Sequence, residues 1–108
     1  MSNAEPASLF AALGDATRLG LIASLSDGKA RSIVQLGDGL PISRQAVAKH
    51  LDVLHDAGLV HRRKSGREVQ YALRHEAIEA AQGWLDQVSA QWDGALARLK
   101  LMLEGGKG

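Results

Sequence analysis

Hydrophobic positions in the first half of the chain recur every three or four residues, which places them on one face of an α-helix. Each of these amphipathic segments ends near a glycine, a residue that closes helices easily. In the second segment we expect Leu19, Ile22 and Leu25 to face the core. In the third, Ser32 and Gln35 form a capping-box pattern. The spacing predicts four helices, in segments 9–14, 15–28, 32–39 and 43–58, with side-chain caps at Asp15, Ser32 and Ser43.

The spacing of apolar residues changes after Gly58, from a helical period to the alternation of a β-strand. Val69, Tyr71 and Leu73 alternate with polar neighbours, and two such segments, 59–64 and 69–73, flank a glycine-containing tip, as in a β-hairpin. The helical period then returns from 75 to 103. The pattern predicts a mainly helical α+β domain of five helices and one hairpin, in residues 5–104. Residues 1–4 look like the remnant of a purification tag, and residues 105–108 are expected to fray.

The last predicted helix carries a long, narrow apolar stripe. Its members follow steps of three and four residues over about three and a half heptads, and they are Ile78, Ala81, Leu85, Val88, Trp92, Ala95, Leu99 and Met102. Because a small domain seldom needs so long a stripe for itself, we expect a homodimer in which two such helices pack together. The alternative is that the helix packs only on its own domain. The expected interface residues on this helix are Leu85, Val88, Trp92, Ala95 and Leu99.

Charge is unevenly distributed along a chain whose net charge is only +1. Between Lys29 and Arg67 there are eight basic and three acidic residues, whereas from His75 onward there are three basic and five acidic residues. A polyanion would therefore meet a positive central region. The absence of cysteine excludes disulfides, thiolate metal sites and cysteine nucleophiles, and it fits a cytoplasmic protein. No apolar run approaches the ~20 residues of a membrane span, and no Ser/His/Asp grouping or carboxylate pair predicts an enzyme.

A helix, a tight turn, a second helix and a basic hairpin together favour binding to double-stranded DNA. The first residues of a helix in the major groove can reach base edges, where Arg44 suits guanine and Gln45 suits adenine. The hairpin gathers four cations whose mutual repulsion a phosphate backbone would relieve. If the helix that begins after Ser43 is considered without the hairpin, the alternative is that its polar face is an ordinary solvent-exposed face that binds nothing. The expected DNA-contacting residues are Ser43, Arg44, Gln45, Ala48, Lys49, Arg62, Lys64 and Arg67.

Three stretches of the sequence resemble the ArsR/SmtB-like family of winged helix-turn-helix regulators. They are LGDATRL at residues 13–19, SRQAVAKHL at 43–51 and LHDAGLV at 54–60. The resemblance extends over nearly the whole chain and implies a dimeric repressor whose first and last helices form the interface. This adds Leu9 to the expected interface residues. It also implies that DNA affinity falls when an effector binds.

The departures from the family pattern concern metal sites. The family's thiolate sensors carry cysteines in the third helix, where this chain has SIVQL at residues 32–36. Zinc-type members use one pair of ligands early in the last helix and a second pair about three turns later. Here His75 lies at an early position, but the residues near the later positions are Val88 and Gln91, so the second pair of ligands is missing. We therefore expect a non-metal subgroup with no metal and no cofactor, and a packed, hydrogen-bonded His50. Two alternatives stay open: a regulator gated by an unidentified small molecule or metal, and a protein-interaction module that no longer binds DNA.

Overall fold

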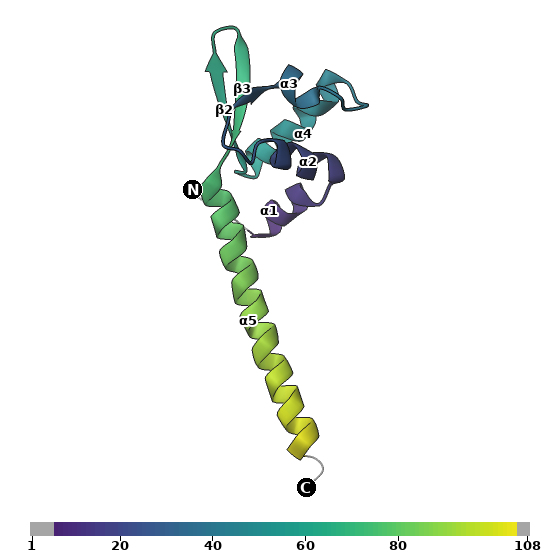
Figure 1. Cartoon of the computed structure of the whole chain (residues 1–108), viewed down its shortest axis with the longest axis vertical. Coiled ribbons are helices and arrows are strands. Elements are labelled where there is room, and N and C mark those ends of the chain that lie inside the picture. Colours follow the sequence, from purple (N-terminus) through teal and green to yellow (C-terminus); the bar gives the residue numbers. More distant parts are fainter. Residues whose placement is uncertain (1–5, 106–108) are drawn as a thin grey trace.

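The computed structural model describes residues 6–105 as a head of helices and strands from which one long helix projects (Figure 1). The three strands form an antiparallel sheet in the order β1-β3-β2. The predicted five helices and β-hairpin are confirmed, while the expectations for residues 1–4 and 106–108 lie outside the described residues. The elements are α1 (Pro6–Leu13), α2 (Ala16–Ser24), β1 (Arg31–Ser32), α3 (Ile33–Gly37), α4 (Arg44–Asp56), β2 (Val60–Ser65), β3 (Glu68–Leu73) and α5 (His75–Gly105).

The core of the head is built around α4. Val47, Leu51 and Leu54 are fully buried, as their spacing of three and four residues predicts for one face of a helix. Side chains from the other elements close around this stripe, including Leu9, Leu21, Leu25, Leu36, Leu59, Tyr71 and Leu73. Because its inner face is held in this way, α4 can present its other face to solvent.

Two residues lie elsewhere than expected. Leu19 is 51% exposed, because the buried face of α2 is formed by Leu21, Ile22 and Leu25. At 100° per residue, Leu19 lies about 110° from the centre of that face. Leu9, which the resemblance assigned to a dimer interface, is 1% exposed and packs in the core of its own head. Leu9 therefore has almost no surface left to offer a partner.

Side-chain caps begin three of the helices, as predicted. The Asp15 carboxylate accepts from the backbone N–H of Arg18 at 3.0 Å and caps α2. At α3 the capping box is complete, since the N–H of Gln35 donates to the Ser32 hydroxyl at 3.2 Å while the Ser32 N–H donates to the Gln35 side chain at 2.9 Å. Such caps satisfy N–H groups that a helix leaves free at its start.

The cap at Asp15 makes stability depend on pH. The backbone N–H of Arg18 holds the pKa of the Asp15 carboxyl below its usual value, and the charge of Arg18 acts in the same direction. A carboxylate with a lowered pKa stabilises the fold above its unfolded pKa of about 4, and this contribution is lost as the pH falls through the lowered value.

Asp15→Asn is therefore expected to lower Tm at neutral pH and to leave Tm nearly unchanged in strong acid. Asparagine still caps a helix, so the substitution removes mainly the charge. Thermal unfolding followed by circular dichroism across a pH series measures the difference. A Tm difference that stays constant from neutral to acid pH would contradict the role assigned to the carboxylate.

The sheet contains a short strand that the sequence pattern did not reveal. Arg31 of β1 pairs with Tyr71 of β3, in a segment that was expected to be only an extended link. Two residues are too few to show an alternation. The β2–β3 hairpin follows the prediction closely, with Arg62 opposite Tyr71, Lys64 opposite Val69, and Gly66 at the tip in a left-handed conformation (φ 62°).

Most of α5 lies away from the head. Its buried side chains are Ala77 and Ala81, and Phe10 of α1 packs against Trp84 with ring centroids 5.3 Å apart. Beyond Trp84 the helix projects (Figure 1), and the radius of gyration is 19.2 Å, against about 13 Å for a compact domain of this size. The head therefore covers only the first part of the apolar stripe. The exposed apolar residues of the projection are Leu85, Trp92, Leu96, Leu99, Leu101, Met102 and Leu103.

Candidate nucleic-acid interface

The N-terminal end of α4 lies at the surface of the head because of the turn that precedes it. α3 and α4 approach closely there, since a Cβ at Gly37 would lie only 3.2 Å from Cγ2 of Val47. Gly39 then adopts a left-handed conformation (φ 81°) that reverses the chain, and Ser43 caps α4 by accepting from the N–H of Ala46 at 3.1 Å. The second helix of the pair thus begins at the surface.

The side chains at this helix start can hydrogen-bond outward. Ser43, Arg44 and Gln45 are exposed, Lys49 is exposed one turn later, and Ala48 is half-buried between them. The first turn contains no acidic residue. Because the N-terminus of a helix carries a partial positive charge, these residues and the helix start together favour an anionic partner.

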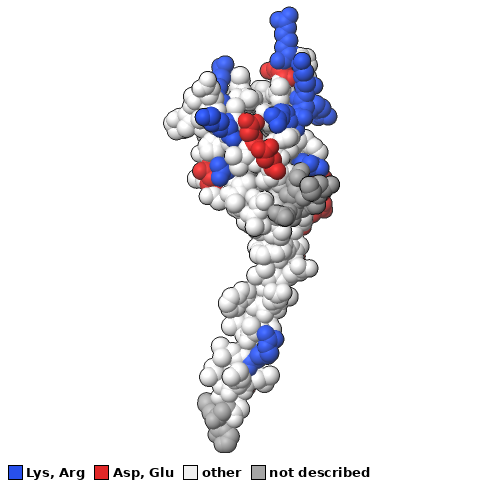
Figure 2. Space-filling view, turned by 180° about the vertical axis from the view of Figure 1, so that it is seen from behind, with Lys and Arg blue, Asp and Glu red and all other residues white. Residues whose placement is uncertain are grey.

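The hairpin carries its cations on both faces and at its tip. Every residue from His61 to Val69 is exposed. Successive side chains of a strand point to opposite faces, so Arg62 and Lys64 lie on the face shared with Tyr71, and Arg63 lies on the other. Arg67 follows Gly66 at the tip. On the face seen in Figure 2, basic side chains gather at the hairpin end of the molecule and few charged side chains are visible along the projecting helix.

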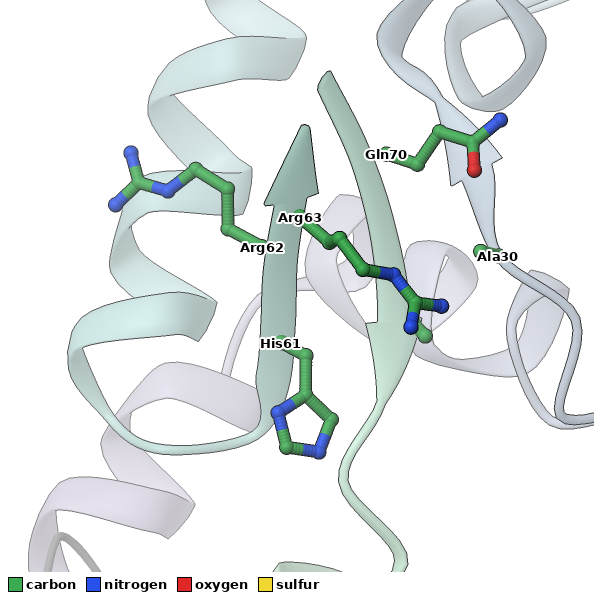
Figure 3. A pocket seen from close by; sticks show the side chains of 6 residues that line it. Ala30, His61, Arg62, Arg63 and Gln70 are labelled. Atoms are coloured by element: carbon green, nitrogen blue, oxygen red, sulfur yellow. The ribbon is translucent and has the colours of Figure 1, made fainter. Parts of the chain in front are cut away.

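Arg62 is held against α4. Its guanidinium lies 3.5 Å from a carboxylate oxygen of Asp52 and donates to Nδ1 of His55 at 3.0 Å. Burial raises the pKa of the nearby Tyr71 hydroxyl, while the Arg62 cation acts in the opposite direction. Figure 3 shows Arg62 and Arg63 leaving β2 toward opposite sides.

On the far side of the hairpin, Arg63 overhangs a shallow pocket. The pocket measures about 310 Å³, and the residues that line it are Ala30, His61, Arg62, Arg63, Gln70 and Ala72, although the Arg62 side chain leaves the strand on the other side (Figure 3). Arg63 is one of the four cations of the hairpin, with Arg62, Lys64 and Arg67, but it is not among the expected DNA contacts. The strand alternation, by which Arg62 and Arg63 must point apart, is the signal that could have separated their roles.

Comparisons with known proteins agree with this geometry. A family model described as a helix-turn-helix domain matches residues 13–63. The chain is 34% identical to the uncharacterized HTH-type transcriptional regulator YuzN of Bacillus subtilis, over 78% of this chain and 99% of the relative. It is 37% identical to the arsenical resistance operon repressor of Escherichia coli, over 68% of this chain and 62% of that protein. Among solved structures, an ArsR-like transcriptional regulator from Rhodococcus sp. RHA1 superimposes with a TM-score of 0.78 at 40% identity, covering 90% of this chain and 91% of the other.

The chain belongs to the ArsR-like family of winged helix-turn-helix transcriptional regulators. This family consists of DNA-binding regulators and not of enzymes. In this ArsR-like regulator α3 and α4 are the helix-turn-helix, and the β2–β3 hairpin is the wing.

The expected DNA-contacting residues of this ArsR-like regulator form two groups. Ser43, Arg44 and Gln45 lie together at the start of α4, with Lys49 one turn further. Lys64 and Arg67 lie near the tip of the wing. Arg62 belongs to neither group, because Asp52 and His55 already engage its guanidinium.

One histidine of this regulator, His50, takes part in the packing of the head. His50 is half-buried and accepts a hydrogen bond at Nδ1 from Arg18, with 3.2 Å between the nitrogens, so the predicted packed histidine is confirmed. The Arg18 Nε also donates to the Ala12 carbonyl at 2.5 Å, which joins α1, α2 and α4. Sequence reasoning missed this bridge, since no spacing rule connects residues so far apart. Within residues 6–105 no three His, Asp or Glu side chains converge as metal ligands, and no helix is long and apolar enough to cross a bilayer.

Proposed function

We propose that this ArsR-like regulator is a homodimeric repressor that binds a palindromic operator. The observation that carries the proposal is the exposed apolar stripe of α5, which continues the helix face that packs on the head at Ala77 and Ala81. One protomer presents an apolar stripe with the spacing of a coiled coil. The same stripe on a second copy can pack against it across a two-fold axis. The proposed interface consists of Leu85, Val88, Trp92, Ala95 and Leu99, without Leu9.

Dimerisation fixes the distance and the relative orientation of the two copies of α4, the proposed recognition helices. Two copies of α4 related by a two-fold axis can enter successive major grooves about 34 Å apart, so the operator repeats its half-site with inverted direction. In each half-site Arg44 and Gln45 contact base edges, while Lys64, Arg67 and the start of α4 contact phosphates. The Escherichia coli relative is named as a repressor, which supports repression as the sign of regulation.

The test is selection of DNA by the purified full chain. A pool of random duplexes carried through several rounds of binding is expected to yield an inverted repeat bound by two protomers, with the stoichiometry measured by analytical ultracentrifugation. A reporter with the selected repeat placed over its promoter is expected to be transcribed less when the protein is present. The proposal fails if no duplex is enriched at low salt, or if the enriched sites have no two-fold symmetry.

The wing makes a separate prediction about salt. Arg67→Ala and Lys64→Ala are each expected to weaken binding to all duplexes alike, and to reduce the slope of log affinity against log salt concentration by about one per lost phosphate contact. Fluorescence anisotropy over a series of KCl concentrations measures this slope. Lys100→Ala removes the same charge from the distant part of α5 and should leave the slope unchanged, whereas an unchanged slope in both wing variants would exclude these phosphate contacts.

A further inference from the structure

Strand β2 of the wing leaves the hydrophobic core soon after it begins, whereas its partner β3 keeps Tyr71 and Leu73 buried. Val60 at the base of β2 is buried, but every later residue of that strand is exposed. Among the described residues, the side-chain hydrogen bonds and ion pairs that join β2 to α4 are all made by Arg62. Besides the core contacts of Tyr71 and Leu73, Arg62 is thus the polar side-chain link that holds the exposed part of the wing against α4.

The partners of Arg62 belong to the helix that reads DNA. Asp52 and His55 lie in the second half of α4, with the carboxylate 3.5 Å and the imidazole Nδ1 3.0 Å from the guanidinium nitrogens. An arginine can serve two acceptors at once because its planar guanidinium carries five N–H groups in a fixed arrangement. A carboxylate on this face repels a phosphate backbone, so its presence is better explained by the arginine that it holds.

We infer that Arg62 is a positioning residue, which fixes the wing against the recognition helix through Asp52 and His55 and does not itself bind phosphate. This inference extends the proposed function, and those of its tests that measure DNA binding rest on the proposed function. Arg63, its neighbour on the other face of β2, has no ion-pair partner among residues 6–105 and remains free for an anion. The two adjacent arginines thus have different roles.

A double-mutant cycle between Arg62→Gln and Asp52→Asn tests the inference on the selected operator. We expect Arg62→Gln to weaken binding by about fivefold, the upper range for an exposed ion pair, without changing the salt slope. Asp52→Asn alone removes a negative charge beside the DNA and yet should not strengthen binding, because it also releases Arg62. In the Arg62→Gln background the same Asp52→Asn should strengthen binding. Additive effects, or a slope reduced in Arg62→Gln by about one for each protomer bound, would overturn the inference.

A second measurement needs no DNA. Hydrogen exchange of the free protein is expected to be faster in the wing amides of Arg62→Gln than in the wild type. Arg63→Gln removes the same charge from the opposite face of the same strand and should leave wing exchange unchanged. Equal exchange in Arg62→Gln and the wild type would overturn the inference. A wild-type chain that selects no duplex would instead refute the proposed function, and the exchange comparison would still decide whether Arg62 fixes the wing.

Discussion

Trp92→Glu is expected to convert the proposed dimer into monomers. The Trp92 side chain is 62% exposed in one protomer and lies midway along the apolar stripe. Truncating a well-packed tryptophan costs about 3–5 kcal/mol, and a symmetric dimer contains the substitution twice. A glutamate there would also have to leave water without a partner for its charge. The dimer dissociation constant should therefore rise by at least about a thousandfold.

Sedimentation velocity at micromolar protein measures this change, and Leu101→Glu is the matched control. Leu101 is 68% exposed on the same helix, but it lies nine positions beyond Trp92, about two and a half turns, and so on the opposite face. Leu101→Glu should remain dimeric and bind the operator normally. Trp92→Glu should lose most of its operator affinity because its two heads no longer bind as one unit. If Trp92→Glu still sedimented as a dimer, the apolar stripe of α5 would not be the dimer interface.

Arg44→Ala is expected to abolish discrimination at one base pair in each half-site. A bidentate contact from arginine to guanine discriminates by about 1–3 kcal/mol, which corresponds to roughly 5- to 150-fold in affinity for each half-site. Since Arg44 is exposed in the first turn of α4, the substitution should leave folding intact. The loss should concern the selected guanine and leave affinity for unrelated duplexes nearly unchanged.

Competition between the selected operator and versions altered at single base pairs measures the discrimination. Lys64→Ala is the comparison, because a lost phosphate contact weakens all duplexes equally and preserves the ranking of sequences. If Arg44→Ala preserved the same ranking as the wild type, Arg44 would be a phosphate contact or no contact at all. The base-reading role would then pass to other residues of the helix start, such as Gln45.

Local signals in the sequence were sufficient for most of the fold. Caps depend on residues three positions apart, so the Ser32–Gln35 box could be predicted and is present. Faces of short helices were harder to predict, because Leu19 fits a three-residue step as well as Leu25 does, and only the position of α4 decides which face is buried. The two-residue strand β1 is defined by its pairing with β3 and has no pattern of its own.

The candidate site was predictable as a set of residues but not as a geometry. Composition located the positive region, and the helix pattern placed Arg44 and Gln45 on an exposed face, where they lie. Composition could not distinguish Arg62, which contacts Asp52, from Arg63, which contacts no acid among the described residues. That distinction needs a partner ten positions away in the chain, and such long-range contacts arise only when the elements pack.

The small contact between α5 and the head has a consequence for dosage. With Ala77 and Ala81 as its buried residues, the helix gains little from its own protomer, so its stability rises with protein concentration once two copies associate. At concentrations below the dimer dissociation constant, the amount of dimer grows with the square of the amount of chain. If the proposed dimer is the form that binds DNA, promoter occupancy would change more steeply than protein abundance and would give a cell a sharp threshold.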